Sequence, residues 1–168
     1  MRTLALALTL VLSLSVSVPA RAAVDETNAN RLNALGLFLG TGSGYDLGGS
    51  PTRLHGIIML TRMLGEEADA LSFDGPCPFS DVAAGKPSAY TGYAFAQGYT
   101  TGVSTTTFRP NGALSFKHYV TFLLRALGYD DGAGDFTFAA SLDKAVEIGM
   151  MTRASADCIL QKQYALYR

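Results

Sequence analysis

The apolar residues of this 168-residue chain follow a helical period in several separate segments. The clearest pattern lies between residues 115 and 128, where apolar side chains recur with spacings of three and four residues. They are Phe116, Tyr119, Val120, Leu123, Leu124 and Leu127. A second stripe follows Thr52 and consists of Ile57, Ile58, Leu60 and Leu64. Because no segment alternates apolar and polar residues over the length of a strand, the pattern predicts an all-α fold.

Polar residues that can cap a helix precede these and other helical segments. The expected caps are Asn28 or Thr27, Thr52, Ser88 and Ser115. Residues 66–87 contain several Gly and Pro residues and are expected to form a linker. Residues 142–149 are expected to form another helix, and residues 161–168 a final helical turn or two.

The chain repeats part of its own sequence. Ala34-Leu35-Gly36 aligns with Ala96-Gln97-Gly98, and Gly40 aligns with Gly102, at an offset of 62 residues. After a gap of one residue, four further positions align at an offset of 63: Thr52 with Ser115, Arg62 with Arg125, and Leu64-Gly65 with Leu127-Gly128. Such a period indicates helix-loop-helix units that bury their apolar faces against one another.

The second copy contains a more specific order of motifs. Phe79-Ser80-Asp81-Val82 is followed by a segment closed by Gly98-Tyr99, then by Gly102, Phe108-Arg109-Pro110-Asn111 and the helix start at Ser115. This order resembles the S-layer homology (SLH) repeat, in which F-x-D-V, an apolar helix, a glycine, F-x-P-x and T-R-A-E follow one another. The resemblance implies helix-loop-helix units that pack as a pseudo-threefold helical prism.

The resemblance also suggests how the chain is divided. Residues 23–65 form a first SLH-like repeat, residues 66–87 a linker and the start of the second, and residues 88–129 the second repeat. Residues 130–168 form a shortened third repeat, since Ile148-Gly149-Met150-Met151-Thr152 matches the helix-closing pair but no Gly-rich loop follows.

Residues 1–22 have the pattern of a secretory signal peptide. Arg2 precedes an apolar run over residues 4–18, and Pro19-Ala20-Arg21-Ala22 offers a cleavage site after Ala22. A retained membrane anchor is the alternative, but no stop-transfer pattern follows the apolar run. We therefore expect a secreted protein that is no longer attached to a membrane after removal of the signal.

Charge and cysteine content restrict the partners further. Removal of residues 1–22 takes away Arg2 and Arg21 and changes the formal net charge from −1 to −3. A mildly acidic protein is a poor candidate for binding nucleic acid, which requires clustered Lys and Arg. Cys77 and Cys158 either form a disulfide or stay free, and the prolines that flank Cys77 favour free thiols.

Two four-residue segments occupy the place of the T-R-A-E signature: Thr52-Arg53-Leu54-His55 and Ser115-Phe116-Lys117-His118. A hydroxyl residue followed three positions later by Glu forms a capping box at a helix start. Here His replaces Glu twice, and a neutral imidazole can accept the same backbone hydrogen bond. We expect four capping residues, Thr52, His55, Ser115 and His118, and a turn or capping role for Asp81.

The resemblance implies that the Arg of this signature contacts an acidic, ketal-pyruvate-bearing sugar of a secondary cell-wall polysaccharide attached to peptidoglycan. Arg53 matches this position, whereas the second copy has Phe116 there and only the neighbouring Lys117, which points about 100° away on a helix. Arg153 lies in a third, partial signature, Thr152-Arg153-Ala154. The expected ligand-binding residues are Arg53, Thr52, Lys117 and Arg153, and a surface role without ligand is the alternative for Arg53.

Other chemistries have weaker support. Neither His has Cys or carboxylate residues at a metal-ligand spacing, so no metal is expected. Residues 40–44 are rich in Gly, but the Lys of a phosphate-binding loop is missing, and no nucleophile elbow occurs. We expect no enzyme activity and no cofactor. The expected function is non-covalent attachment to the cell envelope, at the cell wall or S-layer surface. The alternatives are a structural or protein-binding surface module that has lost sugar recognition, and a small secreted hydrolase.

Overall fold

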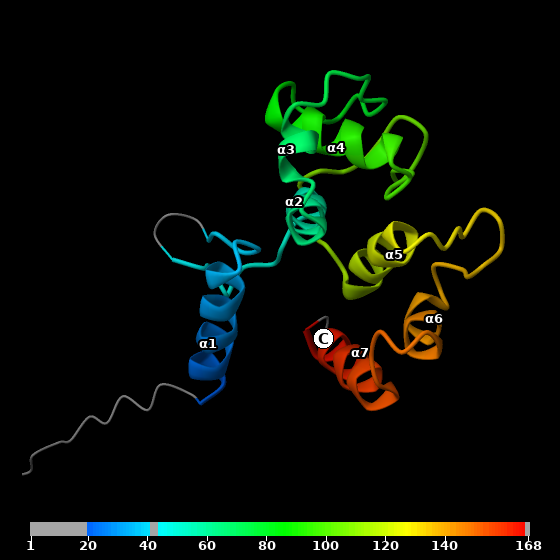
Figure 1. Ribbon diagram of the computed structural model, residues 1–168. Helices are drawn as coiled ribbons and strands as arrows, with labels where there is room; N and C mark the ends of the chain where they lie inside the picture. The colour runs from blue at the N-terminus through cyan, green and yellow to red at the C-terminus, as the bar shows by residue number, and fades with distance from the viewer. Residues whose placement is uncertain (1–19, 41–43, 167–168) are drawn as a thin grey trace, which may run out of the picture.

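The computed structural model describes residues 20–40 and 44–166, which form seven α-helices and no β-strand (Figure 1). The helices are α1 (Ala20–Ala34), α2 (Arg53–Leu64), α3 (Glu67–Leu71), α4 (Lys86–Ala96), α5 (Phe116–Ala126), α6 (Ser141–Glu147) and α7 (Arg153–Leu166). The prediction of an all-α fold is confirmed for these residues. Most of the predicted signal peptide lies outside the described residues, and Ala20–Ala22 belong to α1.

Two helices begin where the pattern of caps predicts. Thr52 and Ser115 adopt extended backbone conformations, and each side chain accepts a hydrogen bond from the N–H group three residues later. α2 then ends at Gly65, as the sequence indicates.

The other helix starts differ from the prediction. Thr27 and Asn28 lie inside α1 and do not cap it. α4 begins at Lys86 after Gly85, because Pro87 fits the first helical turn, and Ser88 donates a hydrogen bond to the carbonyl of Gly85 instead of capping the helix.

Two helices were missed in whole or in part. α3 lies in the expected linker, where the Glu67 carboxylate accepts hydrogen bonds from Tyr90 (2.6 Å) and Arg62 (2.8 Å) and thereby joins α2, α3 and α4. α7 begins at Arg153 and not near residue 161, because the Thr152 hydroxyl accepts the N–H of Ser155 and starts the helix there.

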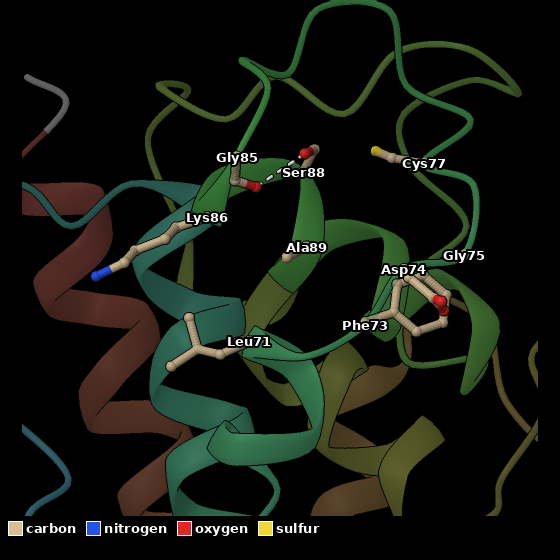
Figure 2. A pocket seen from close by; sticks show the side chains of 9 residues that line it. All are labelled: Leu71, Phe73, Asp74, Gly75, Cys77, Gly85, Lys86, Ser88 and Ala89. Atoms are coloured by element: carbon tan, nitrogen blue, oxygen red, sulfur yellow. Dashed lines mark hydrogen bonds between the residues drawn. The ribbon is translucent and has the colours of Figure 1, made fainter.

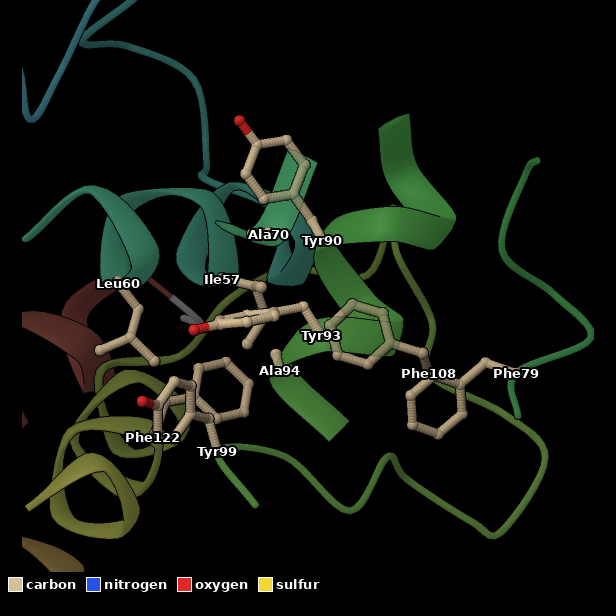
Figure 3. Close-up of a cluster of buried hydrophobic side chains, with 10 residues drawn as sticks. All are labelled: Ile57, Leu60, Ala70, Phe79, Tyr90, Tyr93, Ala94, Tyr99, Phe108 and Phe122. Carbon is tan, nitrogen blue, oxygen red and sulfur yellow. The ribbon is translucent and has the colours of Figure 1, made fainter. Parts of the chain in front are cut away.

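The core consists of two clusters that meet at α5. The first is rich in aromatic residues and joins α2, α3 and α4 to the loops at either end of α4 and to Phe122 of α5 (Figure 3). The second joins Val120 and Leu124 of α5 to α6 and the loops on either side of it. Because opposite faces of α5 are buried in different clusters, this helix connects the two halves of the protein.

The helices from α2 to α7 form a continuous series of contacts. α2 packs on α3, α4 and α5, α3 packs on α4, α5 packs on α6, and α6 packs on α7. The second helix of one predicted repeat thus packs on the first helix of the next in two cases, α2 on α4 and α5 on α6. α1 lies to one side in Figure 1 and has no part in the extensive contacts between described helices.

Candidate functional site

A pocket of about 330 Å³ lies where segments of all three predicted repeats meet. We call it the Arg53 pocket. Its lining residues come from the start of α2, the loop after α4, α5, and the loop between α5 and α6: Arg53, Gly102, Val103, His118, Thr121, Phe122, Arg125, Asp131 and Phe138. The pocket therefore depends on chain segments that are far apart in the sequence.

Arg53 is buried, with 4% of its surface exposed, although it carries a charge. Its Nε donates a 2.7 Å hydrogen bond to the carbonyl of Phe108, and its guanidinium carbon lies 4.8 Å from the centre of the Phe108 ring and 5.5 Å from that of Phe122. Among the described residues the two terminal nitrogens have no hydrogen-bond partner, and neither is fully enclosed. They are therefore open to the pocket.

Arg53 forms no ion pair with the described residues, although the charge of the Asp81 carboxylate lies near enough to favour the charged guanidinium. Burial, followed by the charges of Arg125 and Arg109, lowers the Arg53 pKa to about 10. At neutral pH the guanidinium consequently stays charged, and a buried cation of this kind is stabilised by an anionic partner.

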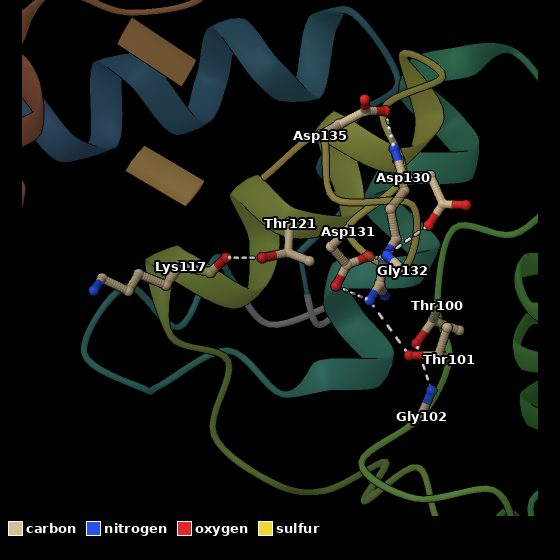
Figure 4. Close-up of polar contacts among 10 residues, drawn as sticks. Thr100, Thr101, Gly102, Lys117, Thr121, Asp130, Asp131, Gly132 and Asp135 are labelled. Carbon is tan, nitrogen blue, oxygen red and sulfur yellow. Dashed lines mark hydrogen bonds and ion pairs between the residues drawn. The ribbon is translucent and has the colours of Figure 1, made fainter. Parts of the chain in front are cut away.

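The second arginine of the pocket is already paired. Arg125 donates from Nε and Nη2 to the two carboxylate oxygens of Asp131, at 2.8 and 2.7 Å, and from Nη2 to the hydroxyl of Thr101 at 3.3 Å. Figure 4 labels the two acceptor residues, Asp131 and Thr101. The hydrogen bonds from Arg125 lower the Asp131 pKa below its usual value. Because Arg125 and Asp131 neutralise each other, the unmatched charge of the pocket is that of Arg53.

The loop before α5 holds Arg53 in place. The Arg53 N–H donates to the carbonyl of Gly112 (2.9 Å), and the Leu54 N–H donates to that of Pro110 (3.1 Å). The loop thereby occupies the backbone N–H groups of Arg53 and Leu54 at this helix start. The pocket thus offers side-chain donors to a ligand and not the start of α2 itself.

Asp81 fixes the same loop. Its two carboxylate oxygens accept the N–H groups of Phe108 (2.8 Å) and Arg109 (2.7 Å). Burial would raise the Asp81 pKa, but these backbone hydrogen bonds keep it below its usual value. Asp81 caps no described helix and lies in a turn, so its part in the site is to position the Phe108 carbonyl that binds Arg53.

His118 both caps α5 and lines the pocket. Its Nδ1 lies 3.4 Å from the Ser115 backbone nitrogen and 2.7 Å from the Ser115 hydroxyl, while the Ser115 hydroxyl accepts the His118 N–H at 3.2 Å. The imidazole also packs against Phe138, with 5.0 Å between ring centres. Burial and the nearby charge of Arg53 lower the His118 pKa, so the ring is neutral at pH 7.

The other expected ligand-binding residues lie outside the pocket. The Thr52 hydroxyl is used in the cap of α2, where it accepts the His55 N–H. Lys117 donates to the carbonyl of Ala139 at 3.0 Å, and Arg153 is exposed and paired with Asp143. Of the four candidates, only Arg53 is brought to the pocket.

Sequence reasoning gave no functional role to Arg125, although the repeat alignment contained a signal. Arg125 aligns with Arg62, and each of them forms an ion pair with a carboxylate just beyond the end of its helix: Arg62 with Glu67 and Arg125 with Asp131. The recurring feature is therefore an arginine that fixes the turn after a helix. Only in the second copy does this turn border the pocket.

A second hollow, of about 460 Å³, lies between α3, the loop after it and the first turn of α4 (Figure 2). Cys77 borders it, and its sulfur lies 3.3 Å from the hydroxyl of Thr91. Cys77 and Cys158 are both free thiols. In contrast to the Arg53 pocket, no buried charged side chain lines this hollow.

Residues 20–40 and 44–166 contain no group of three or more His, Cys, Asp or Glu side chains that could hold a metal ion. None of their helices combines the length and apolarity that a membrane span requires. No protein-family model, curated protein or solved structure matches the chain.

Proposed function

We propose that the protein binds an acidic secondary cell-wall polysaccharide through the Arg53 pocket and thereby attaches non-covalently to the cell envelope. The observation that carries this proposal is a buried guanidinium with two unpaired nitrogens open to a pocket. In this proposal the protein is a secreted, non-enzymatic SLH-like module at the cell wall or S-layer surface.

The chemistry of the pocket favours a carboxylate on a ring-shaped ligand. Two parallel N–H groups of a guanidinium match the two oxygens of a carboxylate, and such charge-assisted bonds are stronger than neutral ones. Phe122 and Phe138 provide apolar surface beside the charge, against which the apolar face of a sugar ring can pack. A carboxylated saccharide supplies both features in one molecule.

The pseudo-threefold prism is part of the same proposal. It is supported by the two equivalent helix contacts, α2 on α4 and α5 on α6. In a complete prism α1 would also pack against a neighbouring unit, whereas here it lies to one side (Figure 1). The proposed binding site does not depend on the packing of α1, because α1 contributes no residue to the Arg53 pocket.

A structural or protein-binding role is the second candidate. It is favoured by the loss of the signature arginine at Phe116 and by the exposed leucines of the first segment, Leu35 (70% exposed) and Leu39 (55% exposed). On this alternative the protein would bind cell walls no better when their acidic polymer is present than after its removal.

The test is a pull-down with purified cell walls that carry a ketal-pyruvate-bearing secondary polymer, before and after its extraction. We expect retention only while the polymer is present. Arg53→Ala should weaken binding about ten- to a hundredfold, as loss of a charge-assisted hydrogen bond worth about 1.5–3 kcal/mol implies. Arg53→Lys keeps the charge but not the paired N–H groups, and should bind with intermediate affinity.

Arg153→Ala is the matched control, because it removes an arginine that is exposed and lies outside the pocket. It should bind like the unmodified protein. Retention that survives extraction of the polymer, or equal affinities of Arg53→Ala and Arg153→Ala, would overturn the proposed function.

A further inference from the structure

We infer that His118 is a second ligand-binding residue of the Arg53 pocket, which donates a hydrogen bond from Nε2 to the same anionic ligand. This inference rests on the proposed function, since it concerns the same pocket. It assigns to His118 a role beyond capping α5.

The capping hydrogen bonds determine which imidazole nitrogen carries the proton. The Ser115 hydroxyl accepts the His118 backbone N–H, so its own hydrogen is free to be donated to Nδ1, 2.7 Å away. The Ser115 backbone N–H also points to Nδ1. Both bonds require Nδ1 to be an acceptor, and the proton of the neutral ring is therefore on Nε2.

Nε2 of His118 has no hydrogen-bond partner among the described residues. No hydrogen bond of the described residues involves it, and it is not among their fully enclosed, unpaired polar atoms. Because His118 lines the pocket and its ring packs on Phe138, another pocket residue, the Nε2–H is open to the pocket. A fixed ring with a free donor is preorganised for a ligand oxygen.

Arg53 lies close enough for its charge to act on His118. The pocket therefore combines a charged donor with two free nitrogens and a neutral donor of fixed direction. A carboxylate has two oxygens and can accept from both side chains at once. Together they favour a carboxylated sugar over a neutral one.

The chain contains a natural control for this inference. His55 forms the same kind of capping box with Thr52 at the start of α2, with Nδ1 at 3.4 Å from the Thr52 nitrogen. His55 does not line the pocket. The same substitution at either histidine should affect the cap of its helix to the same extent. Only the substitution at His118 should also affect ligand binding.

The first experiment compares His118→Glu with His55→Glu. Glu is a standard partner in a capping box, so both helices keep their caps. His55→Glu should unfold near the temperature of the unmodified protein, and His118→Glu at the same temperature or a higher one, since its carboxylate lies beside the buried charge of Arg53. In His118→Glu the new carboxylate lies in the pocket beside Arg53 and repels an anion. We expect at least tenfold weaker binding of the acidic polymer released from the walls, and unchanged binding by His55→Glu.

The second experiment needs no variant at His118. The protein has two histidines, so nitrogen-15 NMR resolves their side chains, and His55→Gln assigns them. Addition of the acidic polymer should shift the Nε2 signal of His118 and leave that of His55 unchanged. The same polymer with its carboxyl groups chemically reduced should cause no shift.

The outcomes distinguish this inference from the proposed function. If Arg53→Ala weakens polymer binding but His118→Glu binds like the unmodified protein and the His118 signal does not move, the role of His118 is wrong and the proposed function stands. If the unmodified protein binds neither the walls nor the released polymer, both are wrong.

Discussion

Replacement of Gly102 by alanine is expected to destabilise the loop that forms one wall of the Arg53 pocket. Gly102 has a φ of +77°, which side chains rarely adopt. A Cβ atom there would lie 2.5 Å from the carbonyl oxygen of Ser104, 2.6 Å from Cε1 of Phe79 and 2.7 Å from the carbonyl oxygen of Thr107. Two of these atoms belong to the backbone, so no side-chain rotation relieves the overlap.

The expected cost has two parts. The left-handed conformation costs alanine about 1–2 kcal/mol, and displacement of well-packed neighbours costs about 1–3 kcal/mol. Together the substitution should reduce the free energy of unfolding by about 2–5 kcal/mol. For a domain of this size each kcal/mol lowers the Tm by about 2–4 °C, so we expect a decrease of about 4–20 °C.

Gly98→Ala is the matched control. Gly98 has almost the same φ, +78°, but no neighbouring atom lies within 4 Å of the position that its Cβ would take. Gly98→Ala should therefore reduce the free energy of unfolding only by the cost of the left-handed conformation, about 1–2 kcal/mol. Thermal unfolding followed by circular dichroism, together with urea titration, measures both variants. A Tm for Gly102→Ala that is no lower than that of Gly98→Ala would refute the steric argument.

Two further predictions concern α5. Leu124→Ala, at a side chain with no exposed surface, should reduce the free energy of unfolding by about 2–5 kcal/mol in a urea titration, whereas Leu127→Ala, at 59% exposure just after α5, should change it by less than about 0.5 kcal/mol. Equal losses would contradict the burial of Leu124 in the second cluster. The lowered pKa of His118 means that the unfolded chain takes up this proton before the folded protein does, so stability should fall as the pH decreases below about 6.5. His118→Gln, which can keep the capping box, should lose less stability between pH 7 and pH 5 in the same titration, and an unchanged loss would show that His118 does not contribute to it.

Much of the local structure could be predicted from the sequence because it depends on residues close together in the chain. The helical stripe of α5 and the capping boxes of Thr52 and Ser115 involve residues three or four positions apart, and these features are present in the structure. The stripe nevertheless included Leu127, which is exposed because α5 ends at Ala126 and the core does not extend beyond it. Periodicity predicted the face of the helix but not the extent of its burial.

The site required information that periodicity does not contain. The sequence identified Arg53 by its place in a signature, but its burial follows from a loop that reaches back to α2, and its hydrogen bond to Phe108 joins residues 55 positions apart. Arg125, Asp131 and Phe138 enter the same pocket only because α5 packs against α2 on one side and α6 on the other. By itself the sequence thus determined the all-α class, the helical face of α5 and the capping boxes of α2 and α5, since these depend on residues within one helical turn of each other, and its signature motif named Arg53 as a candidate. The tertiary structure alone decided which of the candidate cations is buried without an ion pair and lines a pocket, because burial and ion pairing depend on neighbours that distant parts of the chain supply.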